Sequence, residues 1–233
     1  MEANINGADC VISQTGFTGE KGYEIYVRDT HENAEKVWNK VLEDGEEFGL
    51  MVIAPAHHRR IAAGILSWGQ DLDHETSPFQ VNLAYQVPRN KKSDYIGKAE
   101  LERQRDVIDS GDAPFKMKMV GITLGGKEIT DYAPDFWLVA DTDGNDMGYV
   151  TSPWWSPELE TNIALAWVPW SSSEVGTKLL VKLPDEYSVT PGEPVEGEVV
   201  DVPFRESVNP NKREVEAAKG CLLYTSPSPR DIR

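Results

Sequence analysis

The chain has 233 residues, enough to bury one or two hydrophobic cores of ordinary size. Hydrophobic residues make up 39% of it, and their share indicates a globular protein rather than a disordered one. The formal net charge of -16 produces a field that repels phosphate groups. We therefore expect neither nucleic acid nor an anionic membrane as a partner.

Targeting signals and cysteine content indicate the cellular compartment. No apolar run approaches the length of a membrane-spanning helix, and no charged-then-apolar leader opens the sequence. The two cysteines, Cys10 and Cys221, provide neither a disulfide framework nor the spacing of metal ligands. These features predict a protein of the reducing cytoplasm.

The most informative stretch begins at Thr15 and reads TGFTGEKGYEIY. Two short apolar runs, Cys10–Ser13 and Tyr23–Val27, flank a loop that contains three glycines, and this pattern is typical of two strands joined by a loop. Side chains alternate between the two faces of a strand, so Glu24 and Tyr26 are expected on the same face.

Glu24 is the candidate binding residue of this stretch. A carboxylate in a half-buried strand is costly unless hydrogen-bond donors reach it. The N–H groups of an amino-pyrimidinone ring would be suitable donors, and Phe17 could stack on such a ring. The alternative is a surface hairpin with a solvated glutamate.

Helical signals follow this hairpin. Asp29 or Thr30 can cap a helix whose apolar residues form one stripe, which we expect to be core. The stripe contains Ala34, Val37, Trp38, Val41 and Leu42. Leu50–Ile53 is predicted as a buried strand, and Pro55 suits the first turn of a second helix that runs to about Gly64.

A change of pattern divides the chain. A helix opens at Gly97 and runs to about Arg105, and the polar run Asp106–Pro114 is the predicted linker. After it come short runs typical of a small antiparallel barrel. These are Lys116–Leu124, Phe136–Ala140, Met147–Thr151, Asn162–Val168, Lys178–Leu183 and Val195–Val202. The predicted fold class is α+β, with an α+β part at 1–105, a linker at 106–114, a β-barrel at 115–205 and a tail at 206–220.

Two possible metal signals are weak. The run Asp141–Asp146 begins like a calcium loop but lacks the glycine at its sixth position and a glutamate at its twelfth, so we predict a hairpin turn. Adjacent positions on a helix do not face each other, so His57 and His58 are not expected to share a metal ion. No metal site is predicted.

Several motifs together resemble one protein family. The stretch that starts at Thr15 is similar to the TGYTGE-x-G-[FY]-E-I motif of the glycine-cleavage T-protein (aminomethyltransferase) family, which includes the folate-dependent demethylase of dimethylsulfoniopropionate. Further matches follow in the family's order at 54–73, 75–79, 94–101 and 151–169. The resemblance covers about residues 10–205.

This resemblance implies tetrahydrofolate as the cofactor, with Phe17, Glu24 and Arg60 as the residues that bind it. Arg60 matches the second arginine of the family's ARDxLRLEAG motif, whereas the first, a folate contact in the T-protein, falls on Ala56. Tyr26 matches a substrate-contacting tyrosine of the sulfonium demethylase. Trp68, in a stretch similar to that enzyme's LLSYGxD, is its companion as a candidate substrate-binding residue.

The family transfers a one-carbon unit from a small-molecule substrate to tetrahydrofolate. The tyrosine and the LLSYGxD-like stretch favour methyl transfer from a sulfonium such as dimethylsulfoniopropionate. The alternatives are the T-protein reaction, in which an aminomethyl group passes from a lipoyl carrier protein to folate with loss of ammonia, and a non-catalytic folate-binding scaffold. A glycine-loop nucleotide binder is disfavoured, because the sequence has neither GK[ST] nor a basic cluster.

Both ends of the sequence carry expectations of their own. The family's catalytic aspartate is expected upstream of this sequence, as in a C-terminal fragment, so no residue here is assigned as catalytic. Residues 221–233 resemble a translated sequencing adapter and are expected to pack against nothing. The oligomeric state is left open.

Overall fold

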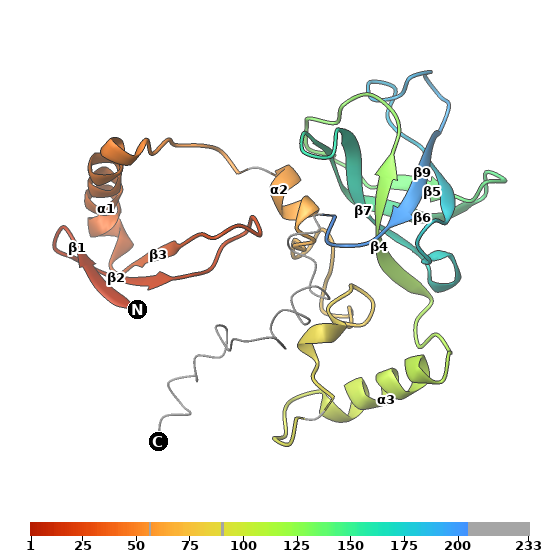
Figure 1. Cartoon of the computed structure of the whole chain (residues 1–233), viewed down its shortest axis with the longest axis horizontal. Coiled ribbons are helices and arrows are strands. Elements are labelled where there is room, and N and C mark those ends of the chain that lie inside the picture. The colour runs from red at the N-terminus through yellow and green to blue at the C-terminus, as the bar shows by residue number, and fades with distance from the viewer. Residues whose placement is uncertain (56, 90, 205–233) are drawn as a thin grey trace. The chain divides into compact units, whose positions relative to one another are not determined.

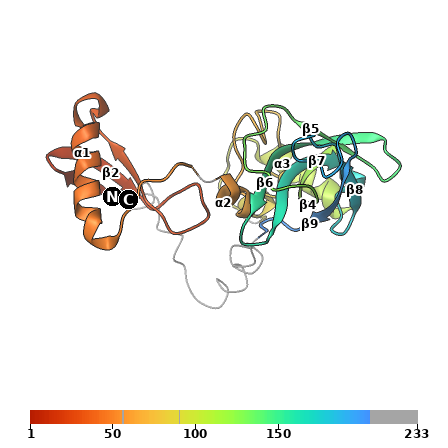
Figure 2. The ribbon, with the colours of Figure 1, turned by 90° about the horizontal axis from the view of Figure 1, so that it is seen from above.

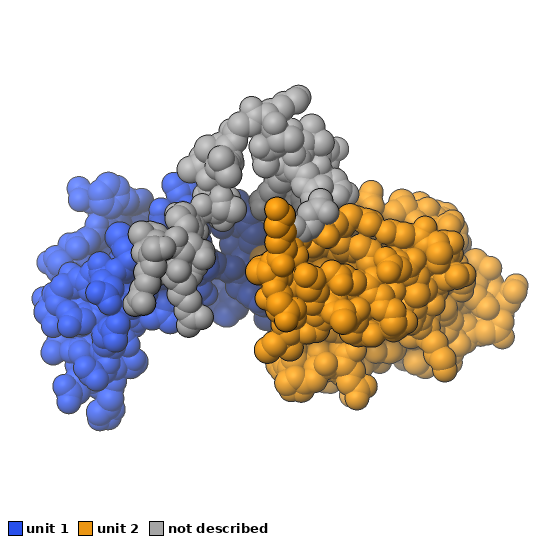
Figure 3. Space-filling view, turned by 90° about the horizontal axis from the view of Figure 1, so that it is seen from below, with its two compact units in different colours: residues 1–60 blue, residues 61–233 orange. Residues whose placement is uncertain are grey.

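The computed structural model describes residues 1–55, 57–89 and 91–204 (Figure 1). The chain divides into two compact units, residues 1–60 and residues 61–233, which are coloured separately in Figure 3. The expectations for Ala56, for the tail at 206–220 and for residues 221–233 fall outside the described residues. Within the described ranges, no helix combines the length and the apolar character that crossing a membrane requires.

The first unit contains a three-stranded antiparallel sheet in the order β1-β2-β3 (Figure 1). Its strands are β1 (Glu2–Ile5), β2 (Ala8–Ser13) and β3 (Glu24–Val27). The latter two confirm the strands expected on either side of the glycine loop. β1 was not expected, although Asn6 and Gly7 form the two-residue turn that joins it to β2, with φ angles of 49° and 83°.

One helix, α1 (Thr30–Gly45), packs on this sheet and precedes the 3-10 turn η1 (Glu46–Phe48). Val37 is buried against Ala8 and Cys10 of β2. The prediction that the whole apolar stripe is core was wrong: Trp38 is 54% exposed and Ala34 is exposed as well. A sheet of three short strands covers only the part of the stripe around Val37.

The predicted buried strand at Leu50–Ile53 was also wrong. All four residues are exposed, Ile53 at 73%, and the segment has no regular structure. An apolar run becomes a strand only where a sheet edge accepts its backbone hydrogen bonds, and the sheet of this unit pairs only β1, β2 and β3. The expected second helix is present as α2 (His57–Ala62).

The second unit is built around a closed antiparallel barrel with the strand order β4-β7-β6-β5-β8-β9 (Figure 2). Its strands are β4 (Met117–Leu124), β5 (Trp137–Ala140), β6 (Asp146–Ser156), β7 (Thr161–Pro169), β8 (Lys178–Val181) and β9 (Val195–Val200). Each falls on one of the six predicted runs. The mixed helix and strand fold with a β-barrel is therefore confirmed.

The barrel interior is apolar. Val120, Ile122, Val139, Val168 and Val181 are all buried in one cluster there. The predicted hairpin turn at 141–146 joins β5 to β6. It is closed by the Asp141 carboxylate, which accepts hydrogen bonds from the backbone N–H of Asp143 at 3.0 Å and of Asn145 at 2.9 Å.

The described residues at 61–89 and 91–116 form no named strand. They run over the outside of the barrel and contain η2 (Ala84–Gln86) and α3 (Lys98–Asp109). They bury the outer face of β4 and β7, because Ile61, Ala62 and Val81 share a cluster with Met119 and Leu165. Trp154 also packs against this cluster.

The start of β4 gains further partners from the same segment. The Gln80 and Asn82 side-chain amides donate to the carbonyls of Met117 at 3.2 Å and Met119 at 3.0 Å. Helix α3 continues to Asp109, inside the segment expected to be a linker. The domain boundaries at 1–105, 106–114 and 115–205 stay a prediction.

Candidate functional site

The β2–β3 hairpin brings three of its polar side chains together. Ser13 pairs with Glu24 and Val11 with Tyr26 across the two strands, so Glu24 and Tyr26 lie on the same face, as the alternation predicted. One carboxylate oxygen of Glu24 accepts hydrogen bonds from the Thr15 hydroxyl and, at 3.0 Å, from the Tyr26 hydroxyl. The three side chains form a hydrogen-bonded group, which we call the Glu24 cluster.

This cluster lies on the surface of the first unit. Glu24 is exposed and Tyr26 is 56% exposed, so the expectation of a half-buried strand was wrong. β3 is the edge of its sheet, and α1 packs near β2 through Val37 rather than over the Glu24 face. The donors that a carboxylate requires come from within the hairpin itself.

Hydrogen bonding sets the protonation states of the cluster. The Thr15 hydroxyl, followed by the Tyr26 hydroxyl, lowers the pKa of Glu24 below its usual value. The hydrogen bond to Glu24 and the charge of that carboxylate raise the pKa of Tyr26. At neutral pH the cluster therefore presents an ionised carboxylate and a protonated phenol.

The glycine loop between β2 and β3 carries two exposed aromatic rings. Phe17 is 51% exposed and Tyr23 is 60% exposed. Gly19 adopts a φ angle of 75°, a conformation that favours glycine, and this allows the loop to turn back toward β3. A planar ligand can stack on such exposed rings.

The predicted folate contact Arg60 lies in α2 and is buried, at 2% exposure. Burial, together with the charge of Arg60, lowers the pKa of the neighbouring His57. Arg60 therefore has a different environment from the exposed Glu24 cluster. Its role in cofactor binding stays a prediction.

Trp68 belongs to the second unit, whereas Tyr26 belongs to the first. Trp68 is 61% exposed, and its ring meets that of His74 edge-on with the centroids 4.7 Å apart. Its role as a substrate contact stays a prediction.

A polar group that sequence reasoning missed lies close by in the second unit. The buried Asp71 carboxylate accepts hydrogen bonds from the hydroxyls of Thr151 at 2.5 Å and Ser152 at 2.6 Å, and from the backbone N–H of Ser67 at 2.7 Å. The Trp167 indole donates to the Asp71 carbonyl at 3.0 Å. This Asp71 clamp ties the segment around residue 71 to β6 and β7 of the barrel.

The available signal for this clamp was weak. Asp71 belongs to the stretch 54–73 that resembles the family, and nothing in the spacing linked it to hydroxyls eighty or so positions away. The hydroxyls of Thr151 and Ser152 and the backbone N–H of Ser67 help to satisfy a carboxylate that burial would otherwise make costly. The arrangement is suited to holding structure rather than to chemistry.

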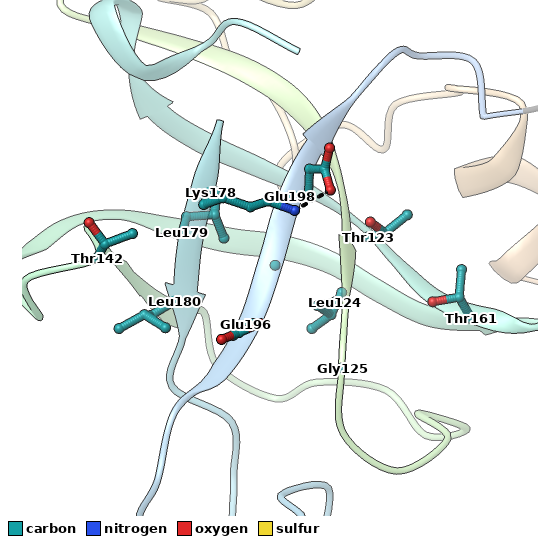
Figure 4. Close-up of a pocket in the computed structure, with 11 residues that line it drawn as sticks. Thr123, Leu124, Gly125, Thr142, Thr161, Lys178, Leu179, Leu180, Glu196 and Glu198 are labelled. Atoms are coloured by element: carbon teal, nitrogen blue, oxygen red, sulfur yellow. Dashed lines mark hydrogen bonds and ion pairs between the residues drawn. The ribbon is translucent and has the colours of Figure 1, made fainter. Parts of the chain in front are cut away.

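A groove of about 640 Å³ lies on the barrel and is lined by β4, β8 and β9 (Figure 4). Figure 4 shows the Lys178 ammonium beside the Glu198 carboxylate, at 2.5 Å, and Glu196 further along β9. None of the predicted site residues lines this groove. It is therefore not the site that the sequence motifs indicated.

Comparison with known proteins indicates the family to which the chain is similar. Residues 1–91 match the family described as the GCVT N-terminal domain, and residues 118–205 match the glycine cleavage T-protein C-terminal barrel domain. The second match coincides with the closed barrel. These matches, together with the relatives below, support assignment of the chain to the glycine cleavage T-protein family.

Several similar proteins are named aminomethyltransferases. Aminomethyltransferases from Geobacillus sp. (strain WCH70) and Bacillus subtilis (strain 168) are 32% and 31% identical, each over 87% of this chain and 51% of the relative. The crystal structure of the glycine cleavage system aminomethyltransferase T from Bartonella henselae matches with a TM-score of 0.65 and 25% identity. That match covers 84% of this chain and 49% of the other. The chain thus spans about half the length of these relatives.

Proposed function

We propose that the chain is part of a tetrahydrofolate-dependent aminomethyltransferase and that its β2–β3 hairpin binds the pterin ring of the cofactor. The observation that carries this proposal is the Glu24 cluster, an ionised carboxylate held in place by Thr15 and Tyr26. The name shared by the relatives favours the T-protein reaction over other one-carbon transfers.

The residues of the hairpin fit this cofactor. Both donors within the cluster reach Oε2 of Glu24, and no other described residue donates to Oε1. That oxygen can accept hydrogen bonds from the N–H groups of an amino-pyrimidinone ring. Phe17 and Tyr23 supply exposed rings for stacking. Tetrahydrofolate, when bound, supplies the nitrogen that accepts the one-carbon unit.

The proposal extends to the rest of the reaction. The donor is a lipoyl carrier protein loaded with an aminomethyl group. Its one-carbon unit passes to folate, and ammonia leaves. Arg60 serves as a further cofactor-binding residue, and the cytoplasm is the expected compartment. No described residue is assigned as the catalytic acid or base.

Methyl transfer from a sulfonium is the second candidate, and Tyr26 is the residue that favours it. In that reaction the Tyr26 hydroxyl would hold the substrate carboxylate, with Trp68 as an aromatic contact. In the structure the same hydroxyl donates to Glu24 at 3.0 Å. Because one hydroxyl proton cannot serve both acceptors at once, Tyr26 acts first as a positioning residue for Glu24.

Titration calorimetry with tetrahydrofolate tests the binding step. Glu24→Ala should weaken binding about tenfold or more, equivalent to about 1.5–3 kcal/mol for hydrogen bonds to a charged group. Glu35→Ala, which removes an exposed carboxylate from α1, is the matched control and should leave the affinity unchanged. Equal losses in the two variants would indicate that only net charge matters and would reject the site.

The reaction is assayed separately, in the chain and in any longer gene product that contains it. We expect ammonia release from an aminomethyl-loaded lipoyl carrier. Methyl transfer from dimethylsulfoniopropionate without ammonia release would establish the second candidate. Folate binding without either reaction would support the non-catalytic scaffold.

A further inference from the structure

A second cavity, unrelated to the folate hairpin, lies wholly within the second unit. It has a volume of about 550 Å³, within the range of small-molecule sites, and is formed by residues 79–89, the end of α3, the start of β4 and the 3-10 turn η3 (Trp170–Ser172). Its walls combine the aromatic residues Phe79, Tyr85 and Trp170 with charged side chains.

The charges of this cavity oppose those of the whole protein. Its lining contains the cations Arg89, Arg105 and Lys118 and a single carboxylate, Asp109, in a chain of net charge -16. Arg89 already pairs with Asp109 through two hydrogen bonds, at 2.5 Å and 2.8 Å. An excess of two positive charges remains on Arg105 and Lys118.

Lys118 differs from an ordinary surface lysine. It is half-buried, and its ammonium lies over the Trp170 ring, 5.1 Å from the centroid. No carboxylate of the described chain forms an ion pair with it. Burial lowers the pKa of Lys118, since a desolvated ammonium without a counter-ion is disfavoured.

Arg105 is held in position. Its guanidinium donates to the Val87 carbonyl and lies over the Phe79 ring, 5.3 Å from the centroid. A guanidinium has five N–H donors, so one such bond leaves others for a ligand. Two cations thus lie against aromatic rings in one cavity, each with donor capacity left over.

We propose that this cavity binds a small organic carboxylate, with its anionic group at Lys118 and Arg105 and its apolar body against Trp170. A carboxylate has two acceptor oxygens, which the remaining N–H groups of Arg105 and the Lys118 ammonium can serve. The remaining lining is apolar and includes Ala84, Val87 and Ile108, which suits a hydrocarbon body. This site is separate from the Glu24 cluster and does not depend on the proposed folate chemistry.

Calorimetric titration of the intact chain with sodium 3-phenylpropionate tests the proposal. We expect saturable binding of one molecule, and binding of the neutral 3-phenylpropanamide should be weaker by about tenfold or more. Lys118→Met should reduce the affinity for the carboxylate by a similar factor. Lys116→Met changes an exposed lysine outside the cavity and should have no effect.

A second measurement covers the case in which Lys118→Met fails to fold. In the unchanged chain, the indole N–H resonance of Trp170, assigned by its absence in Trp170→Phe, should shift with 3-phenylpropionate and not with the amide. Equal affinities for acid and amide, equal competition by inorganic phosphate, an unchanged affinity in folded Lys118→Met, or no saturable binding would each overturn the proposal.

Discussion

Strands β3 and β7 both carry large apolar side chains but differ in how far they are buried. In β7 every residue from Asn162 to Val168 is buried, whereas three of the four residues of β3 are exposed, among them Ile25 at 37%. β7 lies between β4 and β6, and its outer face is covered by Ile61, Ala62 and Val81. β3 has a single neighbouring strand, β2.

The difference shows that burial of these strands depends on coverage rather than on composition. A strand in a closed barrel has one face in the core, and an added layer buries the other. An edge strand in a three-stranded sheet presents one backbone edge and much of its side-chain surface to solvent. The same contrast distinguishes the buried Asp71 clamp from the exposed Glu24 cluster.

Truncation of the β7 core should have the largest effect. Leu165 is fully buried, so Leu165→Ala should destabilise the second unit by about 2–5 kcal/mol, through lost burial and the cavity left behind. Urea unfolding followed by tryptophan fluorescence measures this, because all tryptophans except Trp38 lie in the second unit. Ile25→Ala in β3, followed by hydrogen exchange of β2, should cost less than about 1 kcal/mol. Equal losses of stability in the two variants would contradict the contrast drawn between β7 and β3.

Neutralising the Asp71 carboxylate should have the second-largest effect on stability. Asp71→Asn places a donor NH2 either against the hydroxyls of Thr151 and Ser152 or against the backbone N–H of Ser67, so the free energy of unfolding should fall by about 1–3 kcal/mol. The exposed turn variant Asp143→Asn is the control and should change it by less than about 0.5 kcal/mol. Indistinguishable midpoints in urea would mean that the clamp does not stabilise the fold.

Substitution in the exposed segment 50–53 should have little effect. Ile53 is 73% exposed, so Ile53→Ser should change the free energy of unfolding by no more than about 0.5 kcal/mol. Thermal unfolding by circular dichroism is a sufficient measurement. A loss as large as that of Leu165→Ala would show that this segment is covered in solution.

The smallest effect on stability is expected at Glu24, where the readout is its pKa. Thr15→Ala should raise the pKa of Glu24 toward its usual value, and Tyr26→Phe should raise it less, because the Thr15 hydrogen bond is the larger cause. NMR titration of the carboxyl carbon measures both changes.

The sign of the accompanying stability change follows from linkage. The pKa of Glu24 is lower in the folded chain, so its contribution is present above the unfolded pKa and is lost as the pH falls through the folded pKa. Removal of the Thr15 hydroxyl should narrow the pH range between the folded and unfolded pKa values of Glu24, over which this contribution is lost. A Glu24 pKa that is the same in all three proteins would show that the cluster does not form.

Part of the fold could be predicted from local patterns. The six barrel strands coincide with short apolar runs between turn residues, and the turn closed by Asp141 was read from its own residues. Strand β1 carried a usable signal as well, because Asn6-Gly7 between two short runs is typical of a two-residue hairpin. The shared face of Glu24 and Tyr26 followed from alternation alone.

Other features were decided by tertiary structure. Ile53 and Trp38 have the apolar character of core residues and are exposed, while the polar Asp71 is buried. Periodicity along the chain specifies which side of an element is apolar, but the layer that covers that side comes from residues distant in sequence. The hydrogen bonds that the Asp71 carboxylate accepts from Thr151 and Ser152 of β6 join positions distant in sequence, so they likewise form only when this segment packs on the barrel.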